Sequence, residues 1–227
     1  MRILVVDVGG THVKALLEGE TTRRRFESSR ELTAERMVES TLQLVEGWDF
    51  DHVSVGIPAP VVGDRVVREP VNLGGGWVGF DFAAAFGRPT RVVNDAVMQA
   101  IGSYEGGRML YLGVGTGLGS AMIFEGVVAP MELGHLPFRK ATFEDYVGRA
   151  GRKRLGRKRW RQAVLEVVEH LSAALLPESV VLGGGLADEL GPLPEGIRLG
   201  RNAMAFTGGF RLWNDPQSRR GIAPDGS

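Results

Sequence analysis

The stretch Leu112-Gly113-Val114-Gly115-Thr116-Gly117-Leu118-Gly119-Ser120 places a glycine at every second position. Glycine weakens a strand because it has no side chain to pack. Its repetition therefore favours a backbone that takes unusual dihedral angles and approaches a ligand closely, most often a phosphate. An apolar run, Ala121 to Phe124, and a turn at Glu125-Gly126 follow. The stretch predicts a phosphate loop built into a hairpin.

A carboxylate and an imidazole follow this hairpin, in Glu132-Leu133-Gly134-His135. Both side chains form hydrogen bonds, so the pair can bind neighbouring hydroxyls of a polar ligand such as a sugar. The alternative is structural: Glu132 can be a surface acid, and His135 a hydrogen-bonded core residue beside apolar leucines. The local sequence leaves both interpretations open.

The chain has the composition of an ordinary globular protein, with 227 residues, 43% of them hydrophobic and 24% charged, and a formal net charge of zero. No apolar run reaches the roughly 18 residues of a membrane span, and Asp7 comes too early for a signal peptide. We therefore expect a cytoplasmic protein with no membrane partner. Zero cysteines exclude disulfides and cysteine-bound zinc. A zinc site at His135 would need three more ligands, and we expect none.

Residues 149–161 hold eight Lys or Arg residues and no acid. Such a run is commonly a solvated helix face with no partner. It can also meet an anionic ligand. Both interpretations are kept at this point.

Apolar runs, glycine breaks and helical spacing together predict an α/β fold. The predicted strands are 2–8, 12–18, 21–28, 52–57, 90–93, 108–113, 120–124 and 179–182, with an irregular hairpin at 61–73; the predicted helices are 32–48, 81–86, 96–104, 142–149 and 157–176. The order strand-strand-strand-helix-strand occurs twice, which predicts two lobes with a ligand cleft between them. We divide the chain into an N-terminal lobe at 1–107, a C-terminal lobe at 108–213 and a flexible tail at 214–227.

Two further glycine breaks follow apolar strands. Asp7-Val8-Gly9-Gly10-Thr11 places open backbone N–H groups after an acid that can hold a hydrated Mg²⁺, although a Gly-Gly turn is also a common structural element. Gly183-Gly184-Gly185 suits a backbone pressed against a flat base or a phosphate. Neither is a Walker motif or a dinucleotide fingerprint. Taken together, the three breaks predict a phosphate-donor site.

Asn94-Asp95 falls between a predicted strand and a predicted helix. Asp95 can be a helix N-cap, a frequent role of aspartate. It can also be a general base that takes a hydroxyl proton during phosphoryl transfer. The local sequence favours the cap.

These motifs, in their order and spacing, resemble those of the ROK sugar kinases over nearly all of residues 1–210. The motifs are Asp7-x-Gly9-Gly10-Thr11, Asn94-Asp95-Ala96, Gly115-Thr116-Gly117-x-Gly119 and Glu132-Leu133-Gly134-His135. The resemblance implies an actin-like (ribonuclease H-like) ATPase fold of two lobes with a central cleft.

The resemblance also implies residue roles. Asp95 resembles the catalytic base, and Asp7 would position Mg²⁺ through water. The implied sugar ligands are Asn72, Asn94, Glu132, His135 and Glu144. The implied donor-binding residues are Asp7, Gly9, Gly10, Thr11, Lys14, Gly115, Thr116, Gly117, Gly184 and Gly185, the last two facing a nucleotide if one is used.

Departures from the family pattern refine the expectation. The cysteine knuckle that the family usually has between His135 and Glu144 is missing from this sequence. Together with Ser120 and the five-residue spacing from Asn72 to Trp77, its absence makes the sequence look more like the polyphosphate glucokinase branch than the zinc-containing ATP kinases. Ala59 stands where the family often has glycine. Only six residues precede Asp7, so the DNA-binding extension of the ROK repressors is absent and we expect no nucleic-acid partner.

The resemblance thus implies a hexokinase-type kinase, most specifically a glucokinase. It would transfer a phosphoryl group from polyphosphate, ATP or both to the sugar 6-hydroxyl, with Mg²⁺ as cofactor. The resemblance also implies that the protein is a homodimer. Residues 149–161 would then be a candidate polyanion contact, since basic side chains bind such chains through charge and counterion release. The alternatives are a catalytically silent sugar-binding or scaffold protein of the same fold, and a purely ATP-dependent kinase for another hexose.

Overall fold

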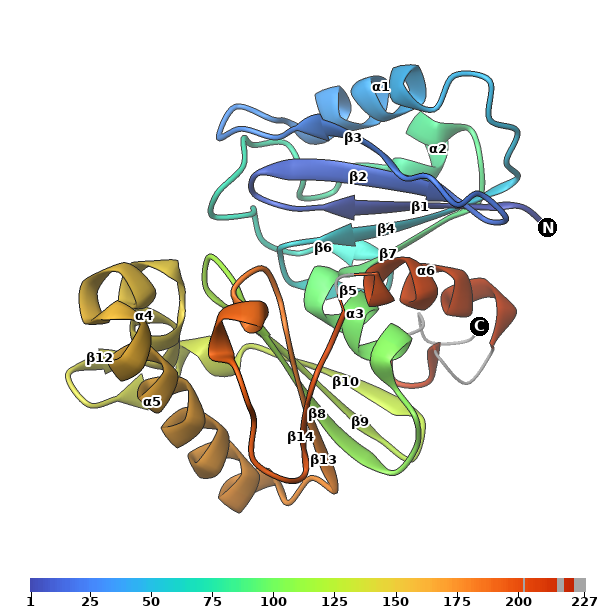
Figure 1. Ribbon diagram of the computed structural model, residues 1–227. Coiled ribbons are helices and arrows are strands. Elements are labelled where there is room, and N and C mark those ends of the chain that lie inside the picture. The colour runs from blue at the N-terminus through green and yellow to red at the C-terminus, as the bar shows by residue number, and fades with distance from the viewer. Residues whose placement is uncertain (202, 216–218, 223–227) are drawn as a thin grey trace.

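The structure, a computed structural model, describes residues 1–201, 203–215 and 219–222. It contains two five-stranded sheets, one above the other in Figure 1. The first has the order β3-β2-β1-β4-β7, and the second the order β10-β9-β8-β13-β14. In each sheet the central strand, β1 or β8, is antiparallel to the strand that follows it in the chain, β2 or β9. On its other side it is parallel to β4 or β13, and the next strand outward, β7 or β14, runs in the same direction. The repeated unit predicted from the sequence is confirmed.

The strands and helices have the following bounds. The first sheet comprises β1 (Ile3–Val8), β2 (His12–Leu17), β3 (Arg24–Glu27), β4 (His52–Ile57) and β7 (Thr90–Asn94); the second comprises β8 (Arg108–Val114), β9 (Leu118–Phe124), β10 (Val127–Met131), β13 (Ser179–Gly183) and β14 (Ile197–Leu199). Two small hairpins pair β5 (Val61–Val62) with β6 (Arg65–Val66), and β11 (Pro137–Phe138) with β12 (Ala141–Thr142). The helices are α1 (Ala34–Leu44), α2 (Phe82–Phe86), α3 (Asp95–Ser103), α4 (Phe143–Val147), α5 (Arg149–Leu175) and α6 (Met204–Asn214), with 3-10 turns at Leu133–His135 and Ala187–Leu190.

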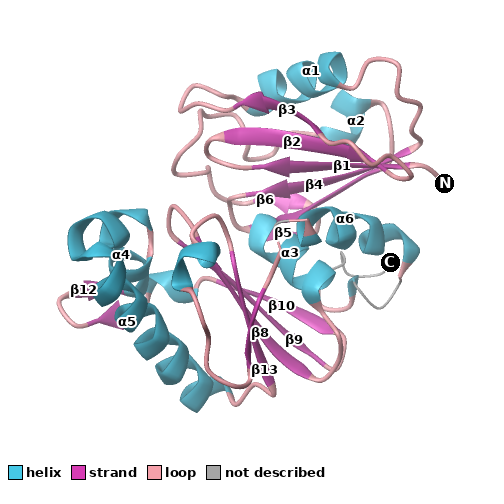
Figure 2. Ribbon diagram, viewed as in Figure 1, coloured by secondary structure: helices cyan, strands magenta, loops and turns pink. Residues whose placement is uncertain are grey.

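Helices cover the sheets in layers (Figures 1 and 2). Helices α1 and α2 pack on the outer face of the first sheet and close one apolar core. Helices α3 and α6 lie between the two sheets and close a second core with residues from both. Helix α5 packs on the outer face of the second sheet and closes a third. Buried apolar strands such as Ile3–Val8 explain why the sequence reads as continuous hydrophobic runs.

Helix α6 and strands β10 and β14 are not among the elements predicted from the sequence. Helix α6 carries Gly208, and a side chain there would overlap the Met98 carbonyl of α3. The two helices therefore cross where glycine allows their backbones to approach closely. Glycine has a low helix propensity, so the sequence alone argues against a helix here. The Ser54 hydroxyl of β4 donates to the Gly209 carbonyl at 2.7 Å, so α6 is fastened to the first sheet although it follows the second in the chain. The lobe boundary at residues 107/108 stays a prediction.

In the basic run, residues 149–161, the helix begins earlier than the predicted start at residue 157. Helix α5 starts at Arg149 and continues across a kink at Gly156, where φ is 73°. Within the expected tail at 214–227, residues 219–222 are described: the Arg219 guanidinium pairs with Asp64 at 2.9 Å, and the Arg220 carbonyl accepts from the Val128 N–H at 2.6 Å. Residues 216–218 and 223–227 of that tail lie outside the described residues. No helix in the described part of the chain is both long and apolar enough to cross a membrane.

Candidate active site

Asp95 occupies the first turn of α3, directly after β7. Asn94 caps this helix, because its Oδ1 accepts hydrogen bonds from the N–H groups of Ala96 at 2.9 Å and Val97 at 3.3 Å. The cap role that the sequence favoured for Asp95 thus belongs to its neighbour. Asp95 Oδ1 accepts from the Ala96 N–H at 2.9 Å, and the carboxylate also accepts from the N–H of Asp95 itself. Both donors are backbone groups, and no side chain among the described residues donates to this carboxylate. A carboxylate has about four lone-pair sites, so it can still accept a reacting proton.

The side-chain amide of Asn94 is largely occupied by the protein. Its Nδ2 donates to the Ala59 carbonyl at 3.1 Å, while its Oδ1 caps α3. An amide nitrogen carries two N–H bonds, so one donor remains for a ligand. Ala59 therefore has a role that the sequence did not reveal: its backbone orients Asn94.

The pKa of Asp95 is raised from 3.8 to about 7. The largest cause is burial, which disfavours the charged form, followed by the negative charge of Asp7; Glu132 adds to the same effect. The N–H bond from Ala96 opposes the shift. Asp7 belongs to the first sheet and Glu132 follows the second, so the two halves of the molecule act on one carboxyl. A carboxylate with a pKa near neutrality is suited to general-base work.

Asp7 lies at the end of β1 and is 8% exposed. The β1–β2 register places Lys14 directly opposite, and its Nζ lies 3.3 Å from Asp7 Oδ2. Burial raises the pKa of Asp7, and the Lys14 ammonium counteracts that rise. Lys14 is 28% exposed at its side chain, so it also reaches solvent at the predicted donor site.

Residues Gly9 to Thr11, the first predicted phosphate loop, are held by their neighbours. The Gly9 N–H donates to His12 O at 3.0 Å, and the Ser28 hydroxyl donates to Gly9 O at 2.6 Å. Asn72 lies against this loop, since a Cβ placed on Gly10 would be 3.8 Å from the Asn72 Cβ. The loop therefore meets one of the predicted sugar ligands.

Glu69 is a supporting residue that the sequence analysis missed. Its carboxylate accepts from the backbone N–H groups of Trp77 at 3.1 Å and Val78 at 3.3 Å. These bonds fasten the segment that follows Asn72. A carboxylate placed before a glycine-rich stretch, Gly74 to Gly76, was the available signal.

Residues Gly115 to Gly117, the second predicted phosphate loop, pack against the start of α5. The Arg149 N–H donates to Gly115 O at 2.9 Å, and the Gly115 N–H donates to Gly117 O at 3.1 Å. A Cβ on Gly117 would lie 2.5 Å from Glu144 Oε2. A side chain at position 117 would therefore displace the carboxylate of Glu144, a predicted sugar ligand. Thr116 is in the same turn, and its carbonyl lies 3.3 Å from the Arg149 nitrogen.

The third glycine break has a packing reason of its own. Gly184 has φ 85°, and a Cβ there would lie 2.5 Å from the Val114 carbonyl oxygen. Gly185 meets no atom within 4 Å of such a Cβ, so its surface is open. Of the two residues predicted to face a nucleotide, Gly185 has the free space; the assignment of both stays a prediction.

Glu132 immediately precedes the 3-10 turn after β10 and His135 ends it, while Glu144 lies on α4; the three side chains come together. His135 Nε2 lies 3.8 Å from Glu132 Oε2, and His135 Nδ1 lies 3.5 Å from Glu144 Oε1. All three side chains are exposed by more than a third, and burial nevertheless raises the pKa of Glu132. The core-residue interpretation of His135 is wrong, because its side chain is 57% exposed between two carboxylates. The arrangement offers several acceptors and one imidazole to a polyhydroxyl ligand.

Ser120 fixes the turn that carries Glu132. Its hydroxyl donates to Met131 O at 2.9 Å and accepts from the Leu133 N–H at 3.0 Å. Ser120 is only 2% exposed, and its hydroxyl uses both its donor and its acceptor functions within the protein, so it has no hydrogen left to donate to a bound phosphate. Ser120 instead joins the glycine loop to the Glu132 turn.

The predicted residues thus fall into two connected groups. Asp7, Lys14 and the Gly9–Thr11 loop belong to the first sheet, and the Gly115–Gly117 loop with Glu132, His135 and Glu144 belongs to the second. Figure 2 shows the β1–β2 turn and the β8–β9 turn at the same side of the molecule as α4. Asp95 connects the groups electrostatically. These features define a two-lobed phosphotransferase of the actin-like sugar-kinase fold.

Comparisons with known proteins agree with this class. The polyphosphate glucokinase of Mycobacterium tuberculosis is 26% identical over 215 residues, covering 84% of this chain and 81% of that protein. The glucokinase of Pyrobaculum calidifontis is 28% identical over 239 residues, covering 82% and 80%. The crystal structure of the inorganic polyphosphate/ATP-glucomannokinase from Arthrobacter sp. strain KM superposes with a TM-score of 0.79 at 26% identity, covering 91% and 96%.

The family model of the ROK family matches residues 3–153. That span is more than half of the chain. The protein belongs to the ROK family, and the resemblance drawn from its motifs is confirmed.

Proposed function

We propose that this protein is a glucokinase that transfers a phosphoryl group to the 6-hydroxyl of glucose. The observation that carries the proposal is Asp95, whose pKa is raised to about 7 and whose carboxylate receives no side-chain hydrogen bond among the described residues. In the reaction, the Asp95 carboxylate takes the hydroxyl proton, the hydroxyl oxygen bonds to the terminal phosphorus of the donor, and the bond from that phosphorus to the rest of the donor breaks.

The sugar is proposed to lie between Asp95 and the Glu132–His135–Glu144 cluster. The 3.8 Å and 3.5 Å contacts of His135 with its two carboxylates support a site for adjacent hydroxyls. Asn94 adds one free amide donor, and Asn72 approaches from the first phosphate loop. Their roles rest on this placement and on the resemblance.

Mg²⁺ is proposed as the cofactor. Protein sites for Mg²⁺ commonly supply one or two carboxylates, with substrate phosphates and water completing the coordination. Asp7 supplies one carboxylate at the end of β1, and Lys14 bonds its Oδ2 and leaves Oδ1 without a partner among the described residues, so one protein carboxylate with water and donor phosphates fits this coordination. When bound, the ion would neutralise charge on the donor phosphates. Lys14 contributes a fixed positive charge to the same place.

Inorganic polyphosphate is proposed as a donor alongside ATP. Four of the eight basic side chains in residues 149–161 contact other parts of the protein. Arg152 pairs with Glu189, and Arg154 donates to Asp145 O. Arg157 and Arg161 donate to carbonyls of residues 189–192. The side chains of Arg149 and Lys153 have no partner among the described residues. Arg149 is also fastened to the second phosphate loop through its N–H. A long polyanion leaving that loop would meet these two charges.

A coupled assay tests the proposal, with glucose and either ATP or polyphosphate under the same Mg²⁺ concentration. We expect glucose 6-phosphate from both donors, at a rate that falls by roughly 10²- to 10⁴-fold in Asp95→Asn. Mannose, glucosamine and fructose run in parallel; a preference for one of these would make the protein a kinase for another hexose. No product with any hexose and either donor would refute the kinase proposal and favour a silent sugar-binding protein.

The donor proposal has its own test. The variant Arg149→Ala/Lys153→Ala should raise KM for polyphosphate several-fold, leave KM for ATP within twofold, and flatten the salt dependence of polyphosphate use. The variant Arg36→Ala, on α1, is the matched control. Product from ATP alone, or equal effects on both donors, would contradict the polyphosphate assignment while leaving the kinase intact.

A further inference from the structure

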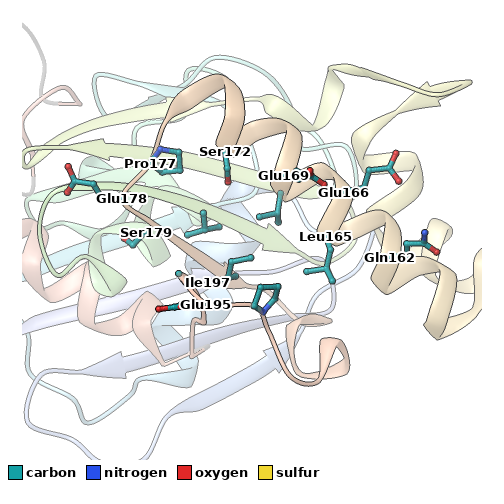
Figure 3. Close-up of a pocket in the computed structure, with 14 residues that line it drawn as sticks. Gln162, Leu165, Glu166, Glu169, Ser172, Pro177, Glu178, Ser179, Glu195 and Ile197 are labelled. Atoms are coloured by element: carbon teal, nitrogen blue, oxygen red, sulfur yellow. The ribbon is translucent and has the colours of Figure 1, made fainter.

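The two faces of the second sheet have different surroundings. The outer face, which α5 covers, carries an open groove of about 760 Å³ between that helix and residues 177–180 and 194–197 (Figure 3). None of the residues that line this groove is a predicted donor-binding residue. The inner face packs against α3 in the core between the two sheets, and Tyr111 of β8 belongs to that core. Tyr111 therefore lies on the side of the sheet that faces the helix of Asp95.

Tyr111 is 1% exposed, and its ring lies against one glycine of β8 and one of β13. A Cβ on Gly113 would lie 3.3 Å from the ring carbon Cε1, and a Cβ on Gly183 would overlap the hydroxyl oxygen. The two glycines are partners in the β8–β13 register. The Tyr111 hydroxyl is therefore placed at the beginning of the third glycine break, Gly183 to Gly185.

The Tyr111 hydroxyl fixes the orientation of an amide on α3. It donates to Gln99 Oε1 at 2.6 Å. The phenol has one hydrogen, and no other acceptor in the described structure receives it. The reverse orientation of the amide would leave this buried hydrogen without a partner, which costs free energy. The Gln99 carbonyl is therefore held toward Tyr111, and the amide nitrogen points away from it.

The amide nitrogen of Gln99 is left available for a ligand. Nε2 has two N–H bonds, and neither has a partner among the described residues. Gln99 is half-buried, and its Nε2 is not one of the buried polar atoms that lack a partner. The nitrogen therefore meets solvent, whereas the oxygen is fixed by the protein.

Gln99 lies between the candidate base and the third glycine break. It follows Asp95 by four residues in α3, so the two side chains leave the same face of the helix. Its carbonyl is bonded to the hydroxyl beside Gly183. Burial raises the pKa of Tyr111, and the negative charges of Asp95 and Asp7 raise it further. The hydroxyl thus stands within electrostatic reach of both the base and the carboxylate proposed to hold Mg²⁺.

We propose that Gln99 binds the phosphoryl donor, with its Nε2 donating a hydrogen bond to a phosphate oxygen, and that Tyr111 is the positioning residue that orients this amide. The inference rests on the proposed function, because the donor of that reaction would extend from Asp95 toward Gly184 and Gly185. A neutral donor suits this place. A lysine or arginine there would favour the ionised form of Asp95 and lower its pKa, whereas an amide binds phosphate without adding charge.

Calorimetry tests the donor contact, with ADP and tripolyphosphate as probes titrated into the full chain in the presence of Mg²⁺. Gln99→Glu keeps an oxygen that accepts from Tyr111 and replaces the N–H donor with a carboxylate oxygen. It should weaken the binding of both probes at least roughly tenfold and leave glucose affinity within twofold. Gln43→Glu, the same change at an exposed position of α1, is the matched control and should bind both probes as the native chain does.

A double-mutant cycle tests the role of Tyr111. Tyr111→Phe alone should weaken ADP binding several-fold, because the Gln99 amide is no longer oriented. In the Gln99→Ala background, Tyr111→Phe should cause no further loss of ADP affinity, since a positioning residue acts only through its partner. A full further loss in that background would contradict the positioning role. A thermal melt shows that each variant folds.

Unchanged affinity of Gln99→Glu for both probes would overturn the proposal. So would an equal loss of glucose affinity, or a native chain that binds neither probe. The readout is binding rather than turnover, so it separates this inference from the proposed function. A chain that loses ADP affinity in Gln99→Glu but makes no glucose 6-phosphate in the coupled assay would refute the kinase proposal and uphold the donor contact.

Discussion

Ionisation of Asp95 should control how turnover depends on pH. Burial and the charges of Asp7 and Glu132 raise its pKa to about 7, and a general base acts only as the carboxylate. With that pKa, about half of the protein carries the carboxylate at pH 7 and about one tenth at pH 6. Values of kcat at saturating substrates should therefore fall as pH falls, approaching tenfold per pH unit below pH 6, and should level off above pH 8.

Substitution of a charged neighbour of Asp95 should shift the midpoint of the pH profile in a direction set by the charge removed, whereas substitution of a remote group should not shift it. Glu132→Gln removes a negative charge that raises the pKa of Asp95, so the midpoint of the kcat profile should move to lower pH. A displacement of one pH unit corresponds to about 1.4 kcal/mol. Asp95→Asn should lower kcat by roughly 10²- to 10⁴-fold, keep glucose binding, and leave a residual rate that is flat between pH 6 and 8.

The measurement is the initial rate of glucose phosphorylation between pH 5.5 and 9, with glucose binding followed separately by calorimetry. Asp188→Asn, an exposed acid without a partner among the described residues, should reproduce the native profile. A native kcat that is flat from pH 6 to 8, or an Asp95→Asn variant within tenfold of the native kcat, would refute the assignment of the base.

Three further changes test how the site is supported. Ser120→Ala should raise KM for glucose several-fold and lower the free energy of unfolding by about 1–3 kcal/mol, because it leaves two backbone groups of the Glu132 turn unpaired; Ser103→Ala, at a buried hydroxyl without a partner in the described structure, should be nearly neutral by urea denaturation. Gly117→Ala should raise KM for glucose, since its Cβ would lie 2.5 Å from Glu144 Oε2, while Gly75→Ala, which meets open space, should behave as the native enzyme in the same assay. Ser54→Ala should cost about 1–3 kcal/mol in a urea titration, because the Gly209 carbonyl and the Trp213 indole N–H both lose their partner; an unchanged midpoint would show that α6 is held by packing alone.

The buried strands and the glycine breaks could be predicted because both leave a local signal. Strands β1 and β4 are rich in valine, leucine and isoleucine and are buried along almost their whole length, as expected for strands covered on both faces. Helix α6 could not, since its Gly208-Gly209 pair counts against a helix unless the close crossing with α3 is known. Strand β10 contains Pro130 at the edge of its sheet, which argues against a strand on sequence alone.

The residues of the candidate site also divide into those that the sequence predicts and those that only the structure reveals. The acids and glycines were found because their chemistry is unusual at strand ends. The residues that hold them were not, because a buried serine or an exposed glutamate has no distinctive pattern. Asn94 and Asp95 are the clearest case: both are common N-cap residues, and only the hydrogen bonds show that Asn94 is the cap.

The glycine loop between β8 and β9 matters most for what it connects. The Glu144 carboxylate lies beside Gly117, where a Cβ would be 2.5 Å from its Oε2, and the loop's carbonyls accept hydrogen bonds from the start of α5. Farther along β9, the Ser120 hydroxyl fixes the turn that presents Glu132. A displacement of this loop on binding donor phosphate would therefore be passed to Glu144 by direct contact and to Glu132 through the strand. Donor and sugar should then influence each other's affinity, and the effect must be reciprocal because it is a single coupling free energy.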